Sequence, residues 1–584
     1  MKNNPYGACK EEVLASLKKV LSDLGYHETQ ITLETPPENL GDAAFSCFSL
    51  AKIAKKAPQK IAEEIALGIQ ATEYIEKCES VGPYVNFYFD SKKLAEMTMR
   101  AALDLKDEYG NSPPIAKKII LEHTSANPTD KLHIGRARNP IIGDTLARIL
   151  KKAGYDVETQ YYVDDMGRQA VTLAYGKKMH SYSEPPEYIP SSDRKKWKEI
   201  KEESFGPYQS GSTMIQTFSW AKKESDAWQN ELEWGEPSIT KSVKAITDET
   251  MEEKIKPTLE KLNVRVDNFV HESQFLKATK DLVASFKESE FCGEEDGAFY
   301  LDLSNYGIEK KFFFVRADGT TLYATRDIAY HLWKAQRGDE IINILGEDHK
   351  LEAKYVVETI KNILKKDLKI ETIFYSFVSL PEGRMSTRKG KVVFMDDLLD
   401  ESIERAEIEV RKRRSDILDD DVKKIAEIVG IGAVRYNLVN VQPEKKIVFR
   451  WEDALNFEGN SAPFIQYSHA RASSILRKAK ELGYEKYDKY NPTLLEHPSE
   501  INLIKEMARF PETIKECAER RTPHTMASYA YGLASMFNQF YRDCPVLACD
   551  DDQLRIARMA LVDAGRIVLK NSLFCLGIDA PEEM

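Results

Sequence analysis

The chain has 584 residues with a formal net charge of −11; 42% of them are hydrophobic and 30% are charged. This length predicts three or four domains, and the composition is typical of a soluble globular protein. No apolar run approaches the roughly 20 residues that span a bilayer, and the N-terminal residues lack the apolar core of a secretory signal. The eight cysteines form no Cys-x-x-Cys pair, so we expect reduced thiols in the cytoplasm and no bound zinc.

The acidic balance limits how the chain can bind nucleic acid. A protein that binds nucleic acid through its overall charge is basic, so this one would need local basic patches. Candidates are Arg388–Lys391, Arg411–Arg414 and Arg520–Arg521, although each is more often a solvated face than a binding surface.

The N-terminal part of the chain predicts an α+β domain. Val13–Leu24 and Ala43–Lys56 have helical patterns, whereas Ile31–Thr35 and Val85–Phe89 are short strand-like runs. The segment Asn111–Pro114, Asn-Ser-Pro-Pro, is typical of a linker.

A β–loop–α–β unit follows the linker. Lys118–Leu121 and Asp156–Val163 predict strands, and an amphipathic helix between them ends near Gly154. The loop carries His133 and Gly135 just before the helix, where backbone N–H groups favour an anion. Gly135 lets a base or phosphate approach closely, and His133 can donate a hydrogen bond to phosphate oxygens. A lone histidine in such a loop is more often a cap or a surface residue.

The middle of the chain predicts an insertion and further strands. Tyr182–Lys244 is polar, tryptophan-rich and punctuated by proline, which indicates a helical insertion. Asp296–Phe314 alternates and predicts added strands, and Ile341–Leu345 is apolar throughout, as in a strand buried on both faces.

A second apolar run, Phe374–Val378, leads into the basic loop Gly383–Lys391. By itself this loop is best interpreted as a solvated surface loop. If both strands belong to one parallel sheet, the loop can close over a triphosphate from the side opposite His133.

From about residue 401 onward the pattern is almost wholly helical and predicts a helix bundle. The predicted domains are 1–112, an N-terminal α+β domain; 115–400, a Rossmann-like parallel-sheet domain with an insertion at about 180–300; and 401–584, an all-α bundle.

The two loops resemble the ATP-binding motifs of class I aminoacyl-tRNA synthetases. His133–Arg136 is similar to His-Ile-Gly-His, and Met385–Lys389 is similar to Lys-Met-Ser-Lys-Ser. Other segments along the whole chain resemble one family of that class, the arginyl-tRNA synthetases. These segments are Glu38–Asp42, Glu122–Pro128, Leu322–Tyr330, Gly346–His349, Asn460–Arg471 and Gly577–Met584.

The resemblance implies an enzyme that makes arginyl-adenylate from L-arginine and ATP and then transfers arginine to tRNA(Arg). ATP would enter as substrate with Mg²⁺, the chain would act as a monomer, and tRNA would be needed for arginine activation. The protein's task in such a reaction is to align reactants and stabilise phosphate charge. The residues implied on the ATP side are His133, Gly135, Arg136, Gly346, Met385, Ser386, Arg388 and Lys389.

Two positions depart from the family pattern. Arg136 replaces the second histidine of the first motif and adds a fixed charge, and Thr387 replaces the second lysine of the second motif. Lys131, Arg136, Arg388 or Lys389 could supply the missing charge on the pyrophosphate, and the sequence does not choose among them.

Arginine recognition calls for carboxylates, because a carboxylate can meet the flat guanidinium in a bidentate manner. The resemblance places Glu122 and Asp327 there with Tyr323 beside them, and Ser125, Asn127 and His349 at the α-amino and carboxylate end. Asp327 could equally be a helix cap when the residues are considered without the resemblance. A polar pocket of this kind discriminates by several kcal/mol, so we expect no editing site.

The C-terminal bundle resembles an anticodon-binding domain, in which aromatic and amide side chains can read unpaired bases. Candidates are Tyr529, Asn538, Gln539 and Tyr541.

Other interpretations stay open on the sequence alone. The cysteine synthetase expects zinc ligands, the glutamate synthetase expects a cationic pocket, and a nucleotidyltransferase lacks the helical half. A catalytically silent paralogue that binds tRNA is a further alternative, because of Arg136 and Thr387.

Overall fold

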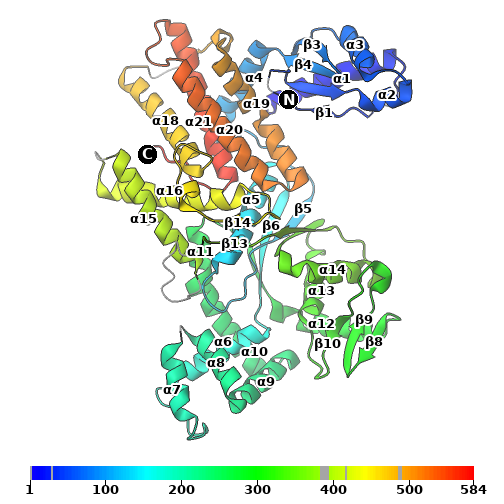
Figure 1. Ribbon diagram of the computed structural model, residues 1–584, viewed down its shortest axis with the longest axis vertical. Helices are drawn as coiled ribbons and strands as arrows, with labels where there is room; N and C mark the ends of the chain where they lie inside the picture. The colour runs from blue at the N-terminus through cyan, green and yellow to red at the C-terminus, as the bar shows by residue number, and fades with distance from the viewer. Residues whose placement is uncertain are drawn as a thin grey trace.

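The computed structural model describes residues 3–27, 30–37, 39–204, 206–381, 393–414, 417–484 and 489–584. A parallel sheet lies near the middle of the molecule, the C-terminal helices and the N-terminal domain lie at one end, and helices of the insertion lie at the other (Figure 1).

The N-terminal domain is a four-stranded antiparallel sheet of order β1-β2-β4-β3, covered by helices around one apolar core. The predicted helix Ala43–Lys56 is wrong in its first part. Ala43–Ser46 is a strand, because the buried Ala43, Ala44 and Phe45 pair with β4, and tertiary pairing overrides the local pattern. The elements are α1 (Pro5–Asp23), β1 (Leu33–Glu34), β2 (Ala43–Ser46), α2 (Phe48–Ala54), α3 (Pro58–Gly68), β3 (Ile75–Val81) and β4 (Tyr84–Phe89).

Helix α4 (Ser91–Leu105) connects this domain to the rest of the molecule. It packs against α19 (Pro498–Arg520) and α21 (Asp552–Cys575) of the C-terminal bundle. The Tyr109 hydroxyl just beyond it donates to the Met507 carbonyl at 3.0 Å. Asn111–Pro114 then has neither helix nor strand, as predicted for a linker.

The central sheet has five parallel strands in the order β12-β11-β5-β6-β7. The chain winds from β5 through β6 to β7, then returns to the other side of β5 with β11 and β12, so the winding reverses between β5 and β11. In open α/β sheets, ligands bind at this reversal, beyond the carboxyl ends of the strands. The strands are β5 (Lys118–Glu122), β6 (Asp156–Val163), β7 (Asn268–His271), β11 (Glu340–Gly346) and β12 (Ile370–Tyr375).

Helices and a small sheet surround the central strands. The predicted insertion is helical, with Trp197 completely buried in its own apolar core. The predicted strands within Asp296–Phe314 form part of a three-stranded antiparallel sheet of order β10-β9-β8. The elements are α5 (Arg138–Lys152), α6 (Arg168–Ser181), α7 (Arg194–Glu203), α8 (Pro207–Thr217), α9 (Ser219–Trp234), α10 (Pro237–Thr250), α11 (Lys256–Lys261), α12 (Leu276–Lys287), β8 (Cys292–Glu295), β9 (Ala298–Leu301), β10 (Phe312–Val315), α13 (Tyr323–Lys334) and α14 (Lys350–Glu358).

The C-terminal bundle begins at Met395, a few residues before the predicted boundary. Its apolar positions, such as Leu503, Met507, Phe510 and Ile514, are completely buried. In the part of the chain that the structure describes, no helix is both long and apolar enough to cross a membrane. Before the bundle lies the short strand β13 (Val378–Ser379), which pairs with β14 (Ile447–Val448). Besides α19 and α21, the helices of the bundle are α15 (Met395–Arg413), α16 (Asp419–Val439), α17 (Trp451–Ala454), α18 (Ala462–Glu481) and α20 (Pro523–Asp543).

Arg138, at the start of α5, ties this bundle to the sheet. Its fully buried guanidinium donates to six main-chain carbonyls, among them Ser376 after β12 (3.3 Å) and Pro443 after α16 (2.7 Å). Arg138, two residues after the His133–Arg136 loop, therefore binds the sheet domain to the bundle.

Candidate functional site

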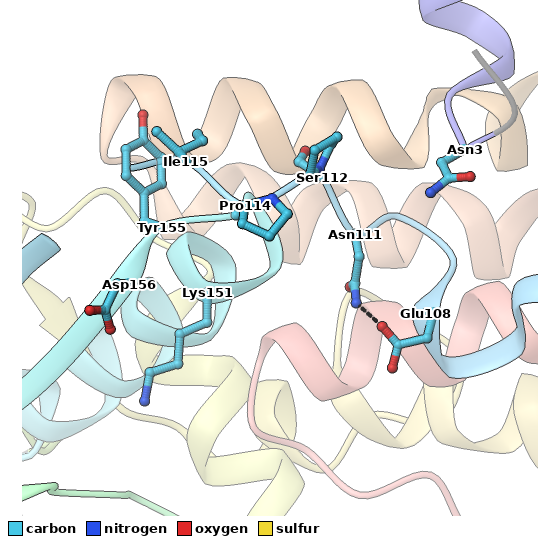
Figure 2. A pocket seen from close by; sticks show the side chains of 11 residues that line it. Asn3, Glu108, Asn111, Ser112, Pro114, Ile115, Lys151, Tyr155 and Asp156 are labelled. Carbon is cyan, nitrogen blue, oxygen red and sulfur yellow. Dashed lines mark hydrogen bonds between the residues drawn. The ribbon is translucent and has the colours of Figure 1, made fainter. Parts of the chain in front are cut away.

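The predicted site residues gather where the winding of the sheet reverses. Glu122 ends β5 and Gly346 ends β11, and these strands are neighbours in the sheet. A Cβ at Gly346 would come within 2.4 Å of Asp348 Oδ1 and 3.2 Å of the Phe377 ring, so a larger residue here would displace one of these side chains. A separate cavity of about 590 Å³ lies beside the linker (Figure 2), lined by Asn111, Pro114, Lys151 and Tyr155 among others. Since Asp156, at the start of β6, also lines it, this cavity lies at the amino ends of the strands and is not part of the site.

His133 is set up as a neutral hydrogen-bond donor. Its Nδ1 accepts a hydrogen bond from the Gly135 N–H at 2.9 Å, so the proton of the neutral ring lies on Nε2. Partial burial and the neighbouring charge of Arg136 lower the pKa of His133, which keeps the ring neutral at pH 7. An exposed Nε2–H group at a helix start can donate to a phosphate oxygen.

The chain on both sides of the second motif contacts this first loop. The Ile134 N–H donates to the Val393 carbonyl at 3.1 Å, and the Met395 N–H donates to the Leu132 carbonyl at 2.7 Å. On the other side, the Arg136 guanidinium lies 5.8 Å from the centre of the Phe377 ring. Met385, Ser386, Arg388 and Lys389 lie outside the described residues.

Arg136 and His349 share one acidic neighbour. Arg136 Nη2 lies 3.5 Å from Asp348 Oδ2, and His349 Nε2 lies 3.7 Å from the same atom. His349 Nδ1 contacts Glu352 Oε2 at 3.0 Å; this hydrogen bond, with the charge of Asp348, raises the pKa of His349. Arg136 and His349 therefore both lie beside Asp348, just beyond the end of β11.

The turn after β5 is strained and is held from outside. Thr124 and Ser125 have φ values of 70° and 37°, a left-handed conformation that is rare for residues with side chains. The Asn139 side chain accepts from the Thr124 N–H (2.7 Å) and donates to the Thr124 carbonyl (3.3 Å). It also donates to the Ile344 carbonyl at 3.0 Å, so α5 and β11 together hold the turn.

This turn places Ser125 and Glu122 together. The Ser125 hydroxyl donates to Glu122 Oε1 at 2.8 Å, and it accepts from the Tyr162 N–H at 3.0 Å. The other Glu122 oxygen accepts from Lys334 Nζ at 2.7 Å. Lys334 is completely buried and is not among the site residues predicted from the sequence.

Asp327 faces the same region from α13. Its Oδ1 lies 3.1 Å from His331 Nδ1, and its side chain keeps 26% of its surface accessible. Burial tends to raise the pKa of Asp327, but the contact with His331 and the charges of Lys334 and His349 outweigh this and lower it. The carboxylate is therefore ionised at neutral pH and can be reached by a ligand.

Tyr323 and Asn127 border an open cavity of about 580 Å³ between the end of β6 and α9. The Tyr323 hydroxyl donates to Asp164 Oδ2, and the Asn127 amide donates to Gln169 Oε1 at 2.8 Å. Asp164 also accepts from the Gly167 N–H at 2.7 Å. Asp164 is not among the site residues predicted from the sequence; it directly follows the predicted strand Asp156–Val163.

A buried ion cluster forms the wall of this cavity. Arg326 Nε donates to Glu272 Oε1 at 2.6 Å, and its Nη1 donates to Glu233 Oε1 at 2.9 Å. Burial, with the nearby charge of Asp164, raises the pKa of Glu272 well above its ordinary value. The cluster joins the insertion, through Glu233 of α9, to the helix that carries Tyr323 and Asp327.

The four candidate tRNA contacts fall into two groups. The Tyr529 hydroxyl donates to the Glu506 carbonyl (2.8 Å), and the Asn538 amide donates to Ser468 Oγ (2.8 Å); both residues are buried within the bundle. Gln539 and Tyr541 are exposed.

Tyr541 borders a cleft of about 670 Å³ between α18, α20 and the chain's C-terminal residues. The Arg471 guanidinium lies between two aromatic rings, 4.7 Å from the centre of Tyr467 and 5.0 Å from that of Tyr541. Further cations line the cleft, namely Arg414, Arg477, Lys478 and Arg542. Aromatic rings beside arginines suit unpaired nucleotides.

No group of three or more His, Cys, Asp or Glu side chains that could hold a metal ion occurs among the residues described. The eight cysteines are free thiols.

Sequence models of known families cover nearly the whole chain. The model for the class I tRNA synthetase (R) catalytic domain matches residues 98–451, more than half of the chain. The chain belongs to the arginyl-tRNA synthetase family. Models for the arginyl-tRNA synthetase N-terminal domain and the DALR anticodon-binding domain match residues 8–89 and 465–584.

Individual arginyl-tRNA synthetases agree over their full lengths. The chain is 44% identical to the arginine–tRNA ligase of Methanocella arvoryzae, covering 98% of this chain and 99% of that one. It is 40% identical to the Methanocaldococcus jannaschii enzyme, at 98% and 100% coverage. The Thermus thermophilus arginyl-tRNA synthetase structure matches with a TM-score of 0.78 and 26% identity, over 98% of this chain and 100% of that one.

Membership in this family favours arginine over the other class I synthetases and over a nucleotidyltransferase, which the motifs alone left open. The expected fold, a Rossmann-like catalytic domain between an added N-terminal domain and a helical bundle, is confirmed.

Proposed function

We propose that the chain ligates L-arginine to tRNA(Arg) in two steps, through an arginyl-adenylate formed from ATP with release of pyrophosphate. The observation that carries this proposal is the meeting of three sets of residues at one sheet reversal. These are the neutral donor His133, the ionised and accessible Asp327, and the strained turn that holds Ser125 beside Glu122.

ATP lies, in this proposal, across the ends of β5 and β11. His133 Nε2–H and the Arg136 guanidinium donate to phosphate oxygens, and Gly135 and Gly346 leave room for the nucleotide. Arg136 supplies the positive charge of the lysine that Thr387 replaces in the second motif. Met385, Ser386, Arg388 and Lys389 contact the phosphates from the opposite side. Mg²⁺ keeps several waters and binds mainly through phosphates, so we expect it to arrive with ATP.

Arginine lies with its guanidinium toward Asp327 and Tyr323, and with its α-amino and carboxylate groups toward Ser125, Asn127 and His349. The accessible Asp327 carboxylate can accept two guanidinium hydrogen bonds. A neutral isostere such as citrulline would leave this charge unmatched, which supports discrimination without an editing site.

tRNA(Arg) would contact the molecule at two distant places. Its terminal adenosine would enter beside Asn127 and Tyr323, and its anticodon loop would occupy the cleft around Arg471 and Tyr541. Gln539, which is exposed nearby on α20, is a further candidate. Because Tyr529 and Asn538 are buried, we assign them a supporting role rather than direct contact.

The deciding experiment is amino-acid-dependent ATP–pyrophosphate exchange with each of the twenty amino acids, with and without bulk tRNA. We expect exchange with arginine only, appearing when tRNA is added. Exchange with another amino acid would refute the pocket assignment. Silence throughout, from folded protein that still binds tRNA, would favour the silent paralogue and point to Arg136 and Thr387.

We also propose that the chain acts in the cytoplasm as a monomer. Light scattering of the purified protein would contradict the second point by giving twice the chain's 66.6 kDa mass.

A further inference from the structure

Lys334 carries a buried charge that the proposed reaction does not use. It lies at the end of α13 with no accessible surface, and its ammonium is 4.0 Å from the centre of the Tyr330 ring. A lysine is almost never fully buried unless it is paired. Its partners are Glu122 Oε2 at 2.7 Å and Asn343 Oδ1 at 2.9 Å.

The contact with Asn343 extends to the second carboxylate. Since Lys334 donates to Asn343 Oδ1, the amide nitrogen points the other way and donates to His331 Nε2 at 2.9 Å. His331 Nε2 is then an acceptor, and Nδ1 is the ring nitrogen that carries a proton. That Nδ1 lies 2.8 Å from the Asp327 carbonyl and 3.1 Å from Asp327 Oδ1.

One continuous chain of buried groups therefore joins the two carboxylates expected to bind guanidinium. Glu122 has both oxygens engaged, one by the Ser125 hydroxyl and one by the Lys334 ammonium. Asp327 contacts the His331 ring and keeps 26% of its side-chain surface accessible. The two carboxylates therefore differ in their surroundings: Glu122 is paired with an ammonium, whereas Asp327 remains accessible to a ligand.

We propose that Lys334 is a specificity-determining residue that neutralises Glu122, so that of these two acids Asp327, and not Glu122, presents the negative charge that matches a guanidinium. This rests on the proposed arginine site. Glu122 becomes a positioning residue for Ser125 and not a guanidinium ligand.

The physical reason is charge balance in a desolvated site. Two unmatched carboxylates would present two negative charges to a substrate side chain that carries one positive charge. An uncompensated buried charge is costly, whereas a paired and hydrogen-bonded one is tolerated. Asp164, the other acid nearby, accepts hydrogen bonds from two neutral donors, the Tyr323 hydroxyl and the Gly167 N–H, and keeps its charge. Arg326 faces Glu272 and Glu233.

The test compares Glu122→Gln with the double variant Glu122→Gln/Lys334→Met. The single change leaves the Lys334 ammonium unmatched and adds a positive charge that repels the substrate. The double change removes both charges and restores the balance, while the introduced amide oxygen can still accept from Ser125. We expect KM for arginine in ATP–pyrophosphate exchange to rise about tenfold or more in the single variant. It should return to within about threefold of wild type in the double, with KM for ATP within about twofold throughout.

Two results would overturn the proposal. If the double variant is as impaired in arginine as Glu122→Gln alone, then the Glu122 carboxylate itself holds the substrate. If Lys334→Met alone has wild-type thermal stability and wild-type KM for arginine, the ammonium does not neutralise Glu122. The first comparison decides the question even where Lys334→Met alone does not fold.

Lys152→Met is the matched control. Lys152 is also a buried lysine, bonded to the Asp107 carbonyl (2.9 Å) and Asn111 Oδ1 (2.7 Å) at the opposite end of the sheet. Its removal should lower the melting temperature and leave KM for arginine unchanged, which separates a charge effect in the pocket from loss of any buried lysine.

Calorimetric titration of the same variants with arginine separates this inference from the proposed function. Wild-type protein that binds arginine but shows no ATP–pyrophosphate exchange would overturn the proposed function alone. The role of Lys334 would then be judged from the dissociation constants of the variants for arginine. Wild-type protein that does not bind arginine, with or without tRNA, would overturn both.

Discussion

Glu122 and Lys334 are buried in the pocket at the end of β5 and pair with each other. In the cleft between α18 and α20, by contrast, Arg471 is only partly buried, and its guanidinium lies near two rings and donates to Asn538 Oδ1. Tyr541, at the rim of that cleft, keeps 43% of its surface accessible. The charges of the pocket are paired inside the protein, whereas the cleft is lined by several cations, of which Arg414 and Arg477 pair with Glu583.

This difference suggests two kinds of recognition. Buried charges with fixed partners discriminate strongly, because a wrong ligand leaves a charge unmatched in a medium that screens it poorly. Accessible cations attract phosphates over a longer range and release counterions, so their contribution depends on salt. The proposed substrates, a small amino acid and a large polyanion, fit these two regions respectively.

The largest expected effect is that of Asp327→Asn. Removing the accessible negative charge while keeping the shape should lower kcat/KM for arginine on the order of 10²–10³-fold, since a buried charge pair loses 2–5 kcal/mol or more on truncation. KM for ATP and the affinity for tRNA should stay near wild type. Exchange kinetics and filter binding measure these quantities, and near-normal use of arginine would refute the guanidinium assignment.

The salt response should separate the two regions next. Raising KCl from about 50 to about 200 mM should weaken tRNA binding on the order of tenfold to a hundredfold, as expected for several phosphate contacts. The dissociation constant for arginine, measured by calorimetry over the same range, should change by less than about twofold. A flat tRNA response would mean that the cleft cations do not contact phosphates.

Tyr541→Ala should have a smaller effect confined to tRNA. Loss of one stacking ring costs about 1–3 kcal/mol, which predicts a roughly tenfold weaker tRNA affinity. Tyr188→Ala is the control, because Tyr188 is also an exposed tyrosine but lies before α7 in the insertion. Equal losses in both variants would argue against the cleft as the site.

The last prediction concerns the stability of the fold below neutral pH and not the binding of a substrate. Complete burial lowers the pKa of His123, beside the strained turn, to about 4. The folded pKa lies below the unfolded value, so the unfolded chain binds the proton more readily and stability falls as pH drops from about 6.5 to about 4, by up to about 3 kcal/mol.

Denaturant melts at several pH values check this prediction. His123→Gln should flatten that part of the stability curve, whereas His27→Gln, at an exposed histidine, should leave it unchanged. The prediction is wrong if the wild type and the His123 variant lose stability in parallel on acidification.

Much of the catalytic domain could be predicted from the sequence because its signals are local. Strand Ile341–Leu345, the β–loop–α–β unit and the helical insertion follow from apolar runs, turn residues and spacing. The helix expected over Ala43–Lys56 failed in its first part for the opposite reason, since a small apolar segment took its conformation from pairing with β4.

For the site, the residue types in the motifs predict which side chains take part. They do not predict whether each side chain is buried, exposed or paired with a charge. The sequence placed Glu122 and Asp327 together as equivalent acids, and Tyr529 with Tyr541 as equivalent aromatics. The structure shows one acid paired and one accessible, and one tyrosine buried and one exposed. The roles of Met385, Ser386, Arg388 and Lys389 in ATP binding remain predictions, because these residues lie outside the described part of the chain.

The sequence by itself determined the order of the motifs, the domain plan and the chemical groups available, because these depend on residue type and short-range periodicity. Only the tertiary structure decided which charge meets which. Lys334 and Glu122 are 212 positions apart, and Arg138 reaches carbonyls about 300 residues away. Such partners are chosen by how strands and helices pack, and burial then sets what each charge is worth.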